Sequence, residues 1–131
     1  MRIKMRLSSE AEYILQTEKE NIKAKEDISV TLGWLVNKAT KNIYKYKEDG
    51  KKIDWKKVKV FPLKLSVPKD TDDYECNTTL NLEKTVVEII EKLQIEFKEI
   101  FEAKRIHKAF VVRMILKANY ILNNNIVNIV K

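Results

Sequence analysis

The sequence predicts a mainly helical protein with a small antiparallel β-ribbon, and three observations support this prediction. Residues 2–7 alternate between charged and apolar side chains, which is the pattern of a strand with one buried face. Residues 77–82 alternate in the same way, with uncharged polar groups in place of the charges. After each stretch, apolar residues recur at helical spacing in two consecutive segments.

The first half of the chain is predicted to form a strand followed by two helices. Ser8 or Ser9 offers an N-cap for a helix that begins directly after the strand. After a polar break at residues 23–27, Ser29 or Thr31 can cap the second helix. The apolar positions of that second helix are Leu32, Leu35, Val36, Ala39 and Ile43.

Gly33 stands near the start of this second helix. A glycine there weakens the helix by about 1 kcal/mol relative to alanine. Close packing of another segment against the helix would explain its presence, and we expect such a contact.

The middle of the chain is the most basic part. Residues 47–69 hold eight basic and three acidic groups, whereas residues 70–131 hold nine and ten. Lysines interleaved with aromatic residues between Lys41 and Lys59 are typical of a surface that binds polyanions. A solvated linker explains the same lysines, and for this segment alone we favour the linker. Trp34 and Trp55 are expected to be packing residues.

The connector also contains a stretch with strand character. Residues 58–67 are rich in residues that favour β-structure, although Pro62 restricts them to an edge strand or to two extended pieces. Such a strand would widen the ribbon, or the segment would form an arm outside it. Residues 63–67 are an alternative second ribbon strand, but residues 77–82 are preferred because they directly precede a helix, as residues 2–7 do.

The two halves of the chain repeat one pattern, with little identity between them. Both follow the order strand, helix, break, helix, and a longer first helix in the second half would absorb the three extra residues there. A lone strand leaves its backbone groups unpaired, so we expect the two strands to pair with each other. The predicted units are residues 1–46, a basic connector with a possible extra strand at 47–76, and residues 77–131.

The repeat resembles the ribbon-helix-helix family of DNA-binding proteins, the class of the Arc and MetJ repressors. The resemblance rests on Arg2-Ile-Lys-Met-Arg-Leu7, which is followed directly by Ser8-Ser-Glu-Ala, and on the second helix start Ile28-Ser-Val-Thr-Leu32. It implies a tandem pseudo-dimer, in which one chain supplies both halves of the usual dimer. It also implies an antiparallel ribbon that enters the major groove of double-stranded DNA.

The resemblance further implies which residues contact DNA. The outward cations of the first strand would contact base edges, and polar residues would do so in the second strand. The start of the second helix in each half would hold a phosphate. The implied DNA-binding residues are Arg2, Lys4, Arg6, Asn77, Thr79 and Asn81 on the ribbon, with Ser29, Val30, His107 and Lys108 at the helix starts.

The sequence gives less support to other classes of function. With one Cys and one His, neither a metal site nor a cofactor is expected, and no residue suggests an enzyme. No apolar run suits a membrane span, so a cytoplasmic protein is expected. The predicted function is therefore that of a repressor or of a plasmid or phage accessory factor that regulates transcription or DNA transfer. The alternative is a helical assembly subunit that associates with itself or with a plasmid or phage protein, in which case the cations of the first strand only protect a sheet edge.

Overall fold

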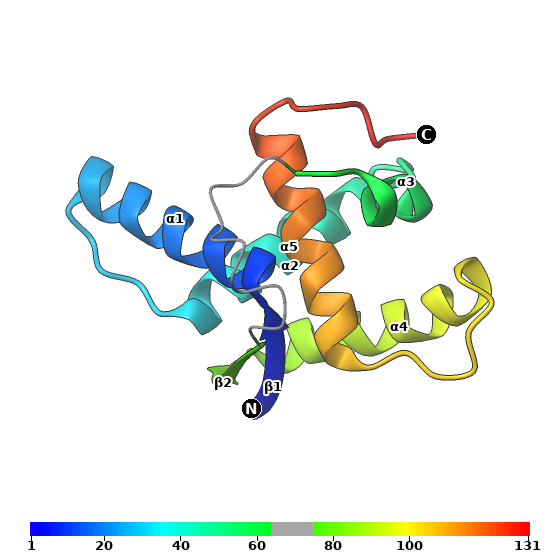
Figure 1. Ribbon diagram of the computed structural model, residues 1–131, viewed down its shortest axis with the longest axis horizontal. Helices are drawn as coiled ribbons and strands as arrows, with labels where there is room; N and C mark the ends of the chain where they lie inside the picture. The colour runs from blue at the N-terminus through cyan, green and yellow to red at the C-terminus, as the bar shows by residue number, and fades with distance from the viewer. Residues whose placement is uncertain (64–74) are drawn as a thin grey trace.

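A computed structural model describes residues 1–63 and 75–131, which form five helices and one two-stranded sheet (Figure 1). The first half of the chain contributes a strand and two long helices, and the second half contributes the same series. A short helix lies between them. In chain order, the elements are β1 (Arg2–Ser8), α1 (Ser9–Glu26), α2 (Leu32–Glu48), α3 (Trp55–Val60), β2 (Glu75–Asn81), α4 (Lys84–Ile100) and α5 (Lys108–Asn123).

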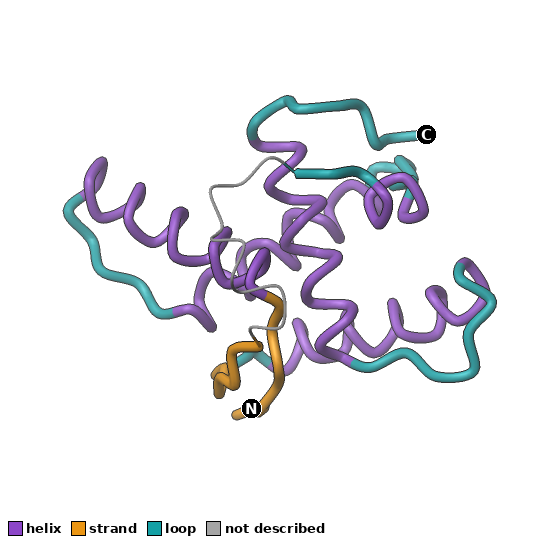
Figure 2. Tube along the Cα trace, in the orientation of Figure 1, coloured by secondary structure: helices purple, strands orange, loops and turns teal. Residues whose placement is uncertain are grey.

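The two strands pair with each other in an antiparallel ribbon, as the repeat predicts. Arg2 lies opposite Asn81, and the register continues to Ser8 opposite Glu75. Beyond the last pair, the amino group of Met1 donates to the carbonyl of Leu82 at 2.6 Å, and the amide of Leu82 donates to the carbonyl of Met1 at 2.8 Å. These two hydrogen bonds extend the pairing by one residue beyond β1 and β2. Figure 2 shows the ribbon at the edge of an otherwise helical molecule.

The helices of the two halves are interleaved. Helix α5 packs against β1 and α1, while α2 packs against β2 and α4, so each half covers the strand of the other. Helices α2 and α5 also pack extensively against each other and cross at the centre of the molecule (Figure 1). One core therefore serves the whole chain, and neither half is built to fold without the other.

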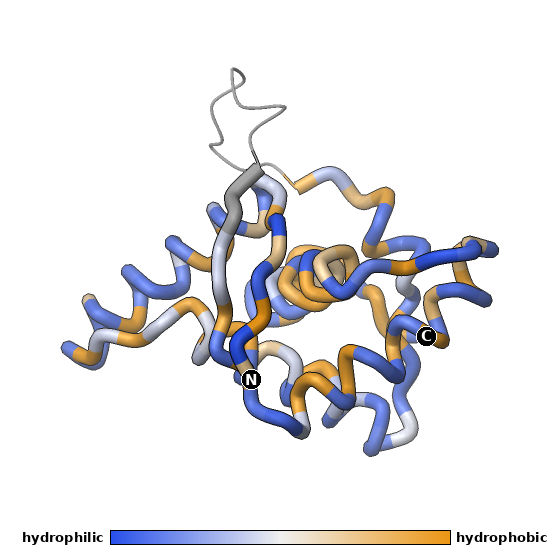
Figure 3. Tube along the Cα trace, turned by 90° about the horizontal axis from the view of Figure 1, so that it is seen from below, coloured by the Kyte–Doolittle hydropathy of each residue, from blue (hydrophilic) through white to orange (hydrophobic). Residues whose placement is uncertain are grey.

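The core lies between the ribbon and the helices. Met5, Leu7 and Leu80 extend into it from the inner face of the ribbon, and each is at most 7% exposed. Phe97 is fully buried, and its ring makes edge-to-face contacts with the rings of Trp55, Phe101 and Phe110 at centroid distances of 4.9 to 6.0 Å. Figure 3 shows the apolar residues concentrated in the central helices and the hydrophilic ones on the outer faces.

Local signals explain where the first two helices begin. The hydroxyl of Ser8 accepts from the amide of Ala11 at 3.2 Å, and that of Thr31 accepts from the amide of Trp34 at 3.1 Å. Each therefore satisfies one of the first-turn amides that a helix leaves without an internal partner. Of the capping residues that the sequence offered, the structure selects Ser8 and Thr31. Helix α1 ends at Asp27, which has a φ of 55°.

The short helix α3 was missed by the sequence prediction. Residues 58–60 were expected to be extended, but they form the second half of α3. Asp54 caps this helix by accepting from the amide of Lys57 at 3.2 Å, and Trp55 and Val58 turn one face of it into the core. Within the described residues the sheet has two strands, so residues 58–60 do not widen it. Residues 64–67 of the expected strand lie outside the described part of the chain.

The difference in length between the two halves was also assigned to the wrong place. Helix α4 has 17 residues and α1 has 18, so the first helix of the second half is not longer. The extra residues lie instead in the connections, because residues 82–83 separate β2 from α4 and residues 101–107 separate α4 from α5.

Candidate nucleic-acid interface

The outer face of the ribbon carries three cations on β1. Arg2, Lys4 and Arg6 are exposed, whereas Met5 and Leu7, which alternate with them, are buried. This arrangement follows from the period of two along a strand, which turns alternate side chains to opposite faces. The core holds the apolar residues, so the cations are left facing away from the protein.

The partner strand places polar residues beside these cations. The register aligns Arg2 with Asn81, Lys4 with Thr79 and Arg6 with Asn77. Residues that lie directly opposite in an antiparallel pair share a face, so each cation has a neutral polar residue as its neighbour. Thr79 and Asn81 are exposed. The six predicted ribbon positions therefore belong to one face, although the orientation of the Asn77 side chain is outside the described part.

The first turn of α5 lies beside β1, where it adds to the positive charge. A hollow of about 690 Å³ separates the two elements and is lined by Lys4, His107, Lys108 and Arg113 among others. His107 is the N-cap, but its side chain makes no capping hydrogen bond. The first amides of α5 therefore have no side-chain acceptor from the cap, which leaves the positive end of the helix dipole available to an anion.

The first turn of α2 lies beside β2 and is not basic. Gly33 approaches the backbone of Asn81 so closely that a Cβ atom at Gly33 would be 2.7 Å from the Asn81 carbonyl oxygen. The side chain of Asn37 accepts from the amide of Glu83 at 3.1 Å, and Lys41 forms an ion pair with Glu83 at 2.5 Å. The contact expected at Gly33 is thus confirmed, and this side of the ribbon is held by a close backbone approach and a neutral hydrogen bond.

The remaining predicted residues lie before α2. Ser29 and Val30 precede the N-cap Thr31 in the connection between α1 and α2, so they lie just outside the helix. Arg113 was not predicted, although it lines the hollow beside β1. The signal was a single cation inside the apolar run from Ala109 to Leu116, which marks a position where α5 reaches the surface.

The described part of the basic connector, residues 47–63, does not extend the ribbon face. Helix α3 lies beside the C-terminal half of α5, well away from the strands (Figure 1). Several of its lysines have structural partners: Lys57 donates to the carbonyl of Asn128 at 2.7 Å, and Lys59 lies over the ring of Phe101. Trp55 is 7% exposed, as expected of a packing residue, whereas Trp34 is 42% exposed. Residues 47–63 of the connector therefore supply packing contacts rather than a continuation of the outer ribbon surface.

Other kinds of site find little support in the described residues. Between residues 1–63 and 75–131, no three His, Cys, Asp or Glu side chains are grouped so as to hold a metal ion. In the same part of the chain, none of the helices has both the length and the apolar composition needed to cross a bilayer. The acidic residues Glu88, Glu91 and Glu99 lie on the exposed face of α4.

Among these features, the paired strands and the adjoining start of α5 form the surface best suited to bind a large anion. It combines exposed cations at a regular spacing with neutral donors and acceptors and with an uncapped helix start. Comparisons of the chain with family models, with curated proteins and with solved structures found no match.

Proposed function

We propose that this chain is a sequence-specific double-stranded DNA-binding protein of the ribbon-helix-helix type, in which one chain forms a tandem pseudo-dimer. The observation that carries the proposal is the antiparallel register, which puts Arg2, Lys4 and Arg6 on one exposed face with polar partners. A two-stranded ribbon fits the major groove, which is about 12 Å wide.

The chemistry of the ribbon face suits base contacts. Arginine and lysine favour the O6 and N7 atoms of guanine, so the β1 cations suit a guanine-containing half of the site. Asn81 and Asn77 suit adenine, and Thr79 suits a base edge or a thymine methyl group. The hollow beside β1 supplies a phosphate contact through the α5 amides, His107 and Lys108. At the other end of the ribbon, Ser29 and Val30 precede the N-cap Thr31 of α2, and we assign the second phosphate contact to them.

The two ends of the ribbon differ, so we expect the two halves of its DNA site to differ as well. One end carries cations beside the start of α5, and the other carries Asn37 and the Lys41–Glu83 ion pair. Because the symmetry of a DNA site mirrors that of the protein, a non-palindromic target follows. Its biological setting would be repression of transcription, or an accessory step in plasmid or phage DNA processing.

A salt-dependent titration with random duplex DNA tests the proposal. We expect binding at about 50 mM salt, with a log–log slope that corresponds to several neutralised phosphates. A selected site should then bind the unmodified protein more tightly than random DNA does. Absence of binding at low salt would refute the proposal and leave the assembly-subunit alternative.

Matched variants separate the ribbon from the overall charge. Lys4→Ala removes an exposed ribbon cation, and Lys56→Ala removes an exposed cation on α3, away from the strands. On the selected site, Lys4→Ala should cost about 1–3 kcal/mol of binding free energy and relax the preference at one base position. Lys56→Ala should cost much less. Equal losses for the two variants, on every sequence, would contradict groove insertion of the ribbon.

A further inference from the structure

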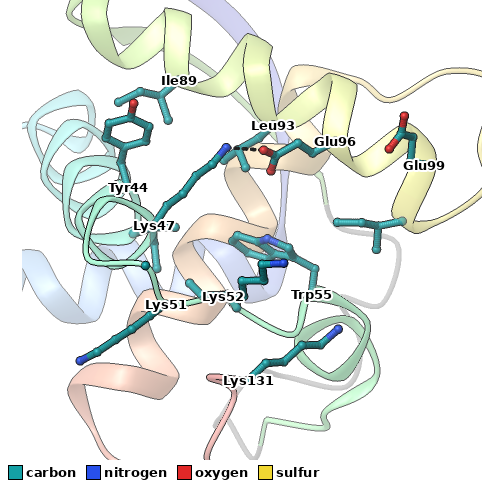
Figure 4. A pocket seen from close by; sticks show the side chains of 14 residues that line it. Tyr44, Lys47, Lys51, Lys52, Trp55, Ile89, Leu93, Glu96, Glu99 and Lys131 are labelled. Carbon is teal, nitrogen blue, oxygen red and sulfur yellow. Dashed lines mark hydrogen bonds and ion pairs between the residues drawn. The ribbon is translucent and has the colours of Figure 1, made fainter.

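A second pocket lies at the end of α2 that is remote from the ribbon. It has a volume of about 540 Å³ and is enclosed by the C-terminal halves of α2 and α4 and by the connector that leads into α3 (Figure 4). Pockets of about 300–1,000 Å³ are the size that holds small organic ligands. The apolar lining consists of Ile43, Ile53, Trp55, Ile89, Leu93 and Ile100.

The charged lining is predominantly positive. Four lysine side chains and two glutamates line the pocket. Lys47 of α2 pairs with Glu96 of α4 across it, which neutralises one charge of each sign (Figure 4). Lys51 points away from the other lining residues in Figure 4 and lies over the ring of Tyr46. The cations left to face a ligand are therefore Lys52 and Lys131, and Glu99 is the one lining anion outside this ion pair, so the lining keeps an excess of positive charge.

Backbone pairing holds these two lysines together. The amide of Lys131 donates to the carbonyl of Lys52 at 2.7 Å, and Ile53 and Val130 form an isolated antiparallel bridge. The amide of Asp54 continues this pairing by donating to the carbonyl of Ile129 at 2.7 Å. Both lysines are exposed, and both line the same pocket as Trp55. Two like charges next to an apolar lining favour a ligand that carries the opposite charge.

We propose that this pocket binds a small organic anion with an apolar body, of the class of aromatic carboxylates and sulfonates. The apolar body would lie against Ile43, Leu93 and Trp55, and the anionic group would lie between Lys52 and Lys131. This site is distinct from the ribbon, because α2 approaches β2 at Gly33 and reaches the pocket only at Ile43, ten residues or about 15 Å farther along the helix. Its test needs no DNA, so its outcome is independent of the proposed function.

The probe is 1-anilinonaphthalene-8-sulfonate, which joins an aromatic body to one sulfonate and fluoresces more strongly in an apolar site. Titration into the native protein should give a saturable increase in emission at one site per chain. Ile89→Trp, which fills the pocket from a half-buried position, should abolish the increase while the circular dichroism spectrum stays native. Persistent binding to that folded variant, or no binding to the unmodified protein, would overturn the proposal.

A charge-matched pair of variants tests the role of the lysines. Lys52→Glu with Lys131→Glu should weaken binding of the sulfonate by about tenfold. Lys56→Glu with Lys104→Glu makes the same change of net charge at exposed positions outside the pocket and should change the affinity less than threefold. N-phenyl-1-naphthylamine has a closely similar apolar body without the sulfonate, and its affinity should be insensitive to both pairs. Equal weakening of the sulfonate by the two pairs would overturn the proposal.

Discussion

Replacing Gly33 by alanine tests the close approach of α2 to β2, which joins the two halves of the chain. Helix propensity alone predicts that the substitution stabilises the protein, because alanine is better than glycine in a helix by up to about 1 kcal/mol. The structure predicts the opposite. The new Cβ atom would lie 2.7 Å from the carbonyl oxygen of Asn81 and 3.0 Å from its amide nitrogen.

The magnitude follows from what the added methyl group meets. Both contacted atoms of Asn81 belong to the backbone of β2, so no side-chain rotation relieves the overlap and α2 must move away from the strand. Overpacking of this kind costs about 1–3 kcal/mol. After subtraction of the propensity gain, Gly33→Ala should lower the free energy of unfolding by up to about 2 kcal/mol.

Urea unfolding followed by far-ultraviolet circular dichroism measures this loss. We expect a lower urea concentration at the midpoint of unfolding. The slope of the free energy of unfolding against urea concentration should not change, because the surface exposed by unfolding stays the same. Adding Asn81→Ala to Gly33→Ala should not restore stability, since the overlap is with the backbone of Asn81 and not with its side chain. A gain of about 1 kcal/mol for Gly33→Ala would refute the close approach of α2 to β2.

Two further substitutions test local features of the fold. Burial raises the pKa of Glu18 above 4.5, although the charge of Lys38 opposes this effect; the folded state therefore favours the protonated acid. Above the raised pKa the buried charge lowers stability, so Glu18→Gln should raise the free energy of unfolding at pH 7, and this gain should vanish as the pH falls below 4.5. Urea unfolding at a series of pH values measures the gain, with Glu20→Gln as the exposed control. Equal behaviour of the two variants would contradict the reasoning. Thr31→Val removes the hydroxyl that accepts from the Trp34 amide and should lower the free energy of unfolding by about 1 kcal/mol, while Thr31→Ser should lower it much less. Urea unfolding measures both losses, and equal losses would show that the cap contributes nothing.

Alternation and helical spacing were sufficient to predict the ribbon and the long helices. The outward cations of β1 follow from Met5 and Leu7, because alternate residues of a strand face opposite sides, and burying the odd-numbered residues turns the even-numbered ones outward. The pairing of β1 with β2 was inferable because a lone strand leaves its backbone groups unpaired, and because residues 77–82 directly precede a helix as residues 2–7 do, which favoured them over the alternative strand at residues 63–67.

The sequence was less informative where different structures compete for similar residues. The segment Trp55–Val60 contains valines that favour a strand, yet the Asp54 cap and the packing of Trp55 against Phe97 make it helical. Tertiary contacts of this kind have no signature in local composition. The pocket at the C-terminal end of α2 was equally hidden, because it joins α2, α4 and the chain around Lys52 and Lys131, which are far apart in the sequence.

The covalent continuity of the ribbon has a consequence for its behaviour in dilute solution. Where two separate chains supply the strands, folding and association are one process, and stability depends on protein concentration. Here Arg2 and Asn81 belong to the same polypeptide, so this surface forms by a first-order reaction and persists at any dilution. Each strand is also free to acquire its own side chains by mutation, because a change in one is not copied into the other.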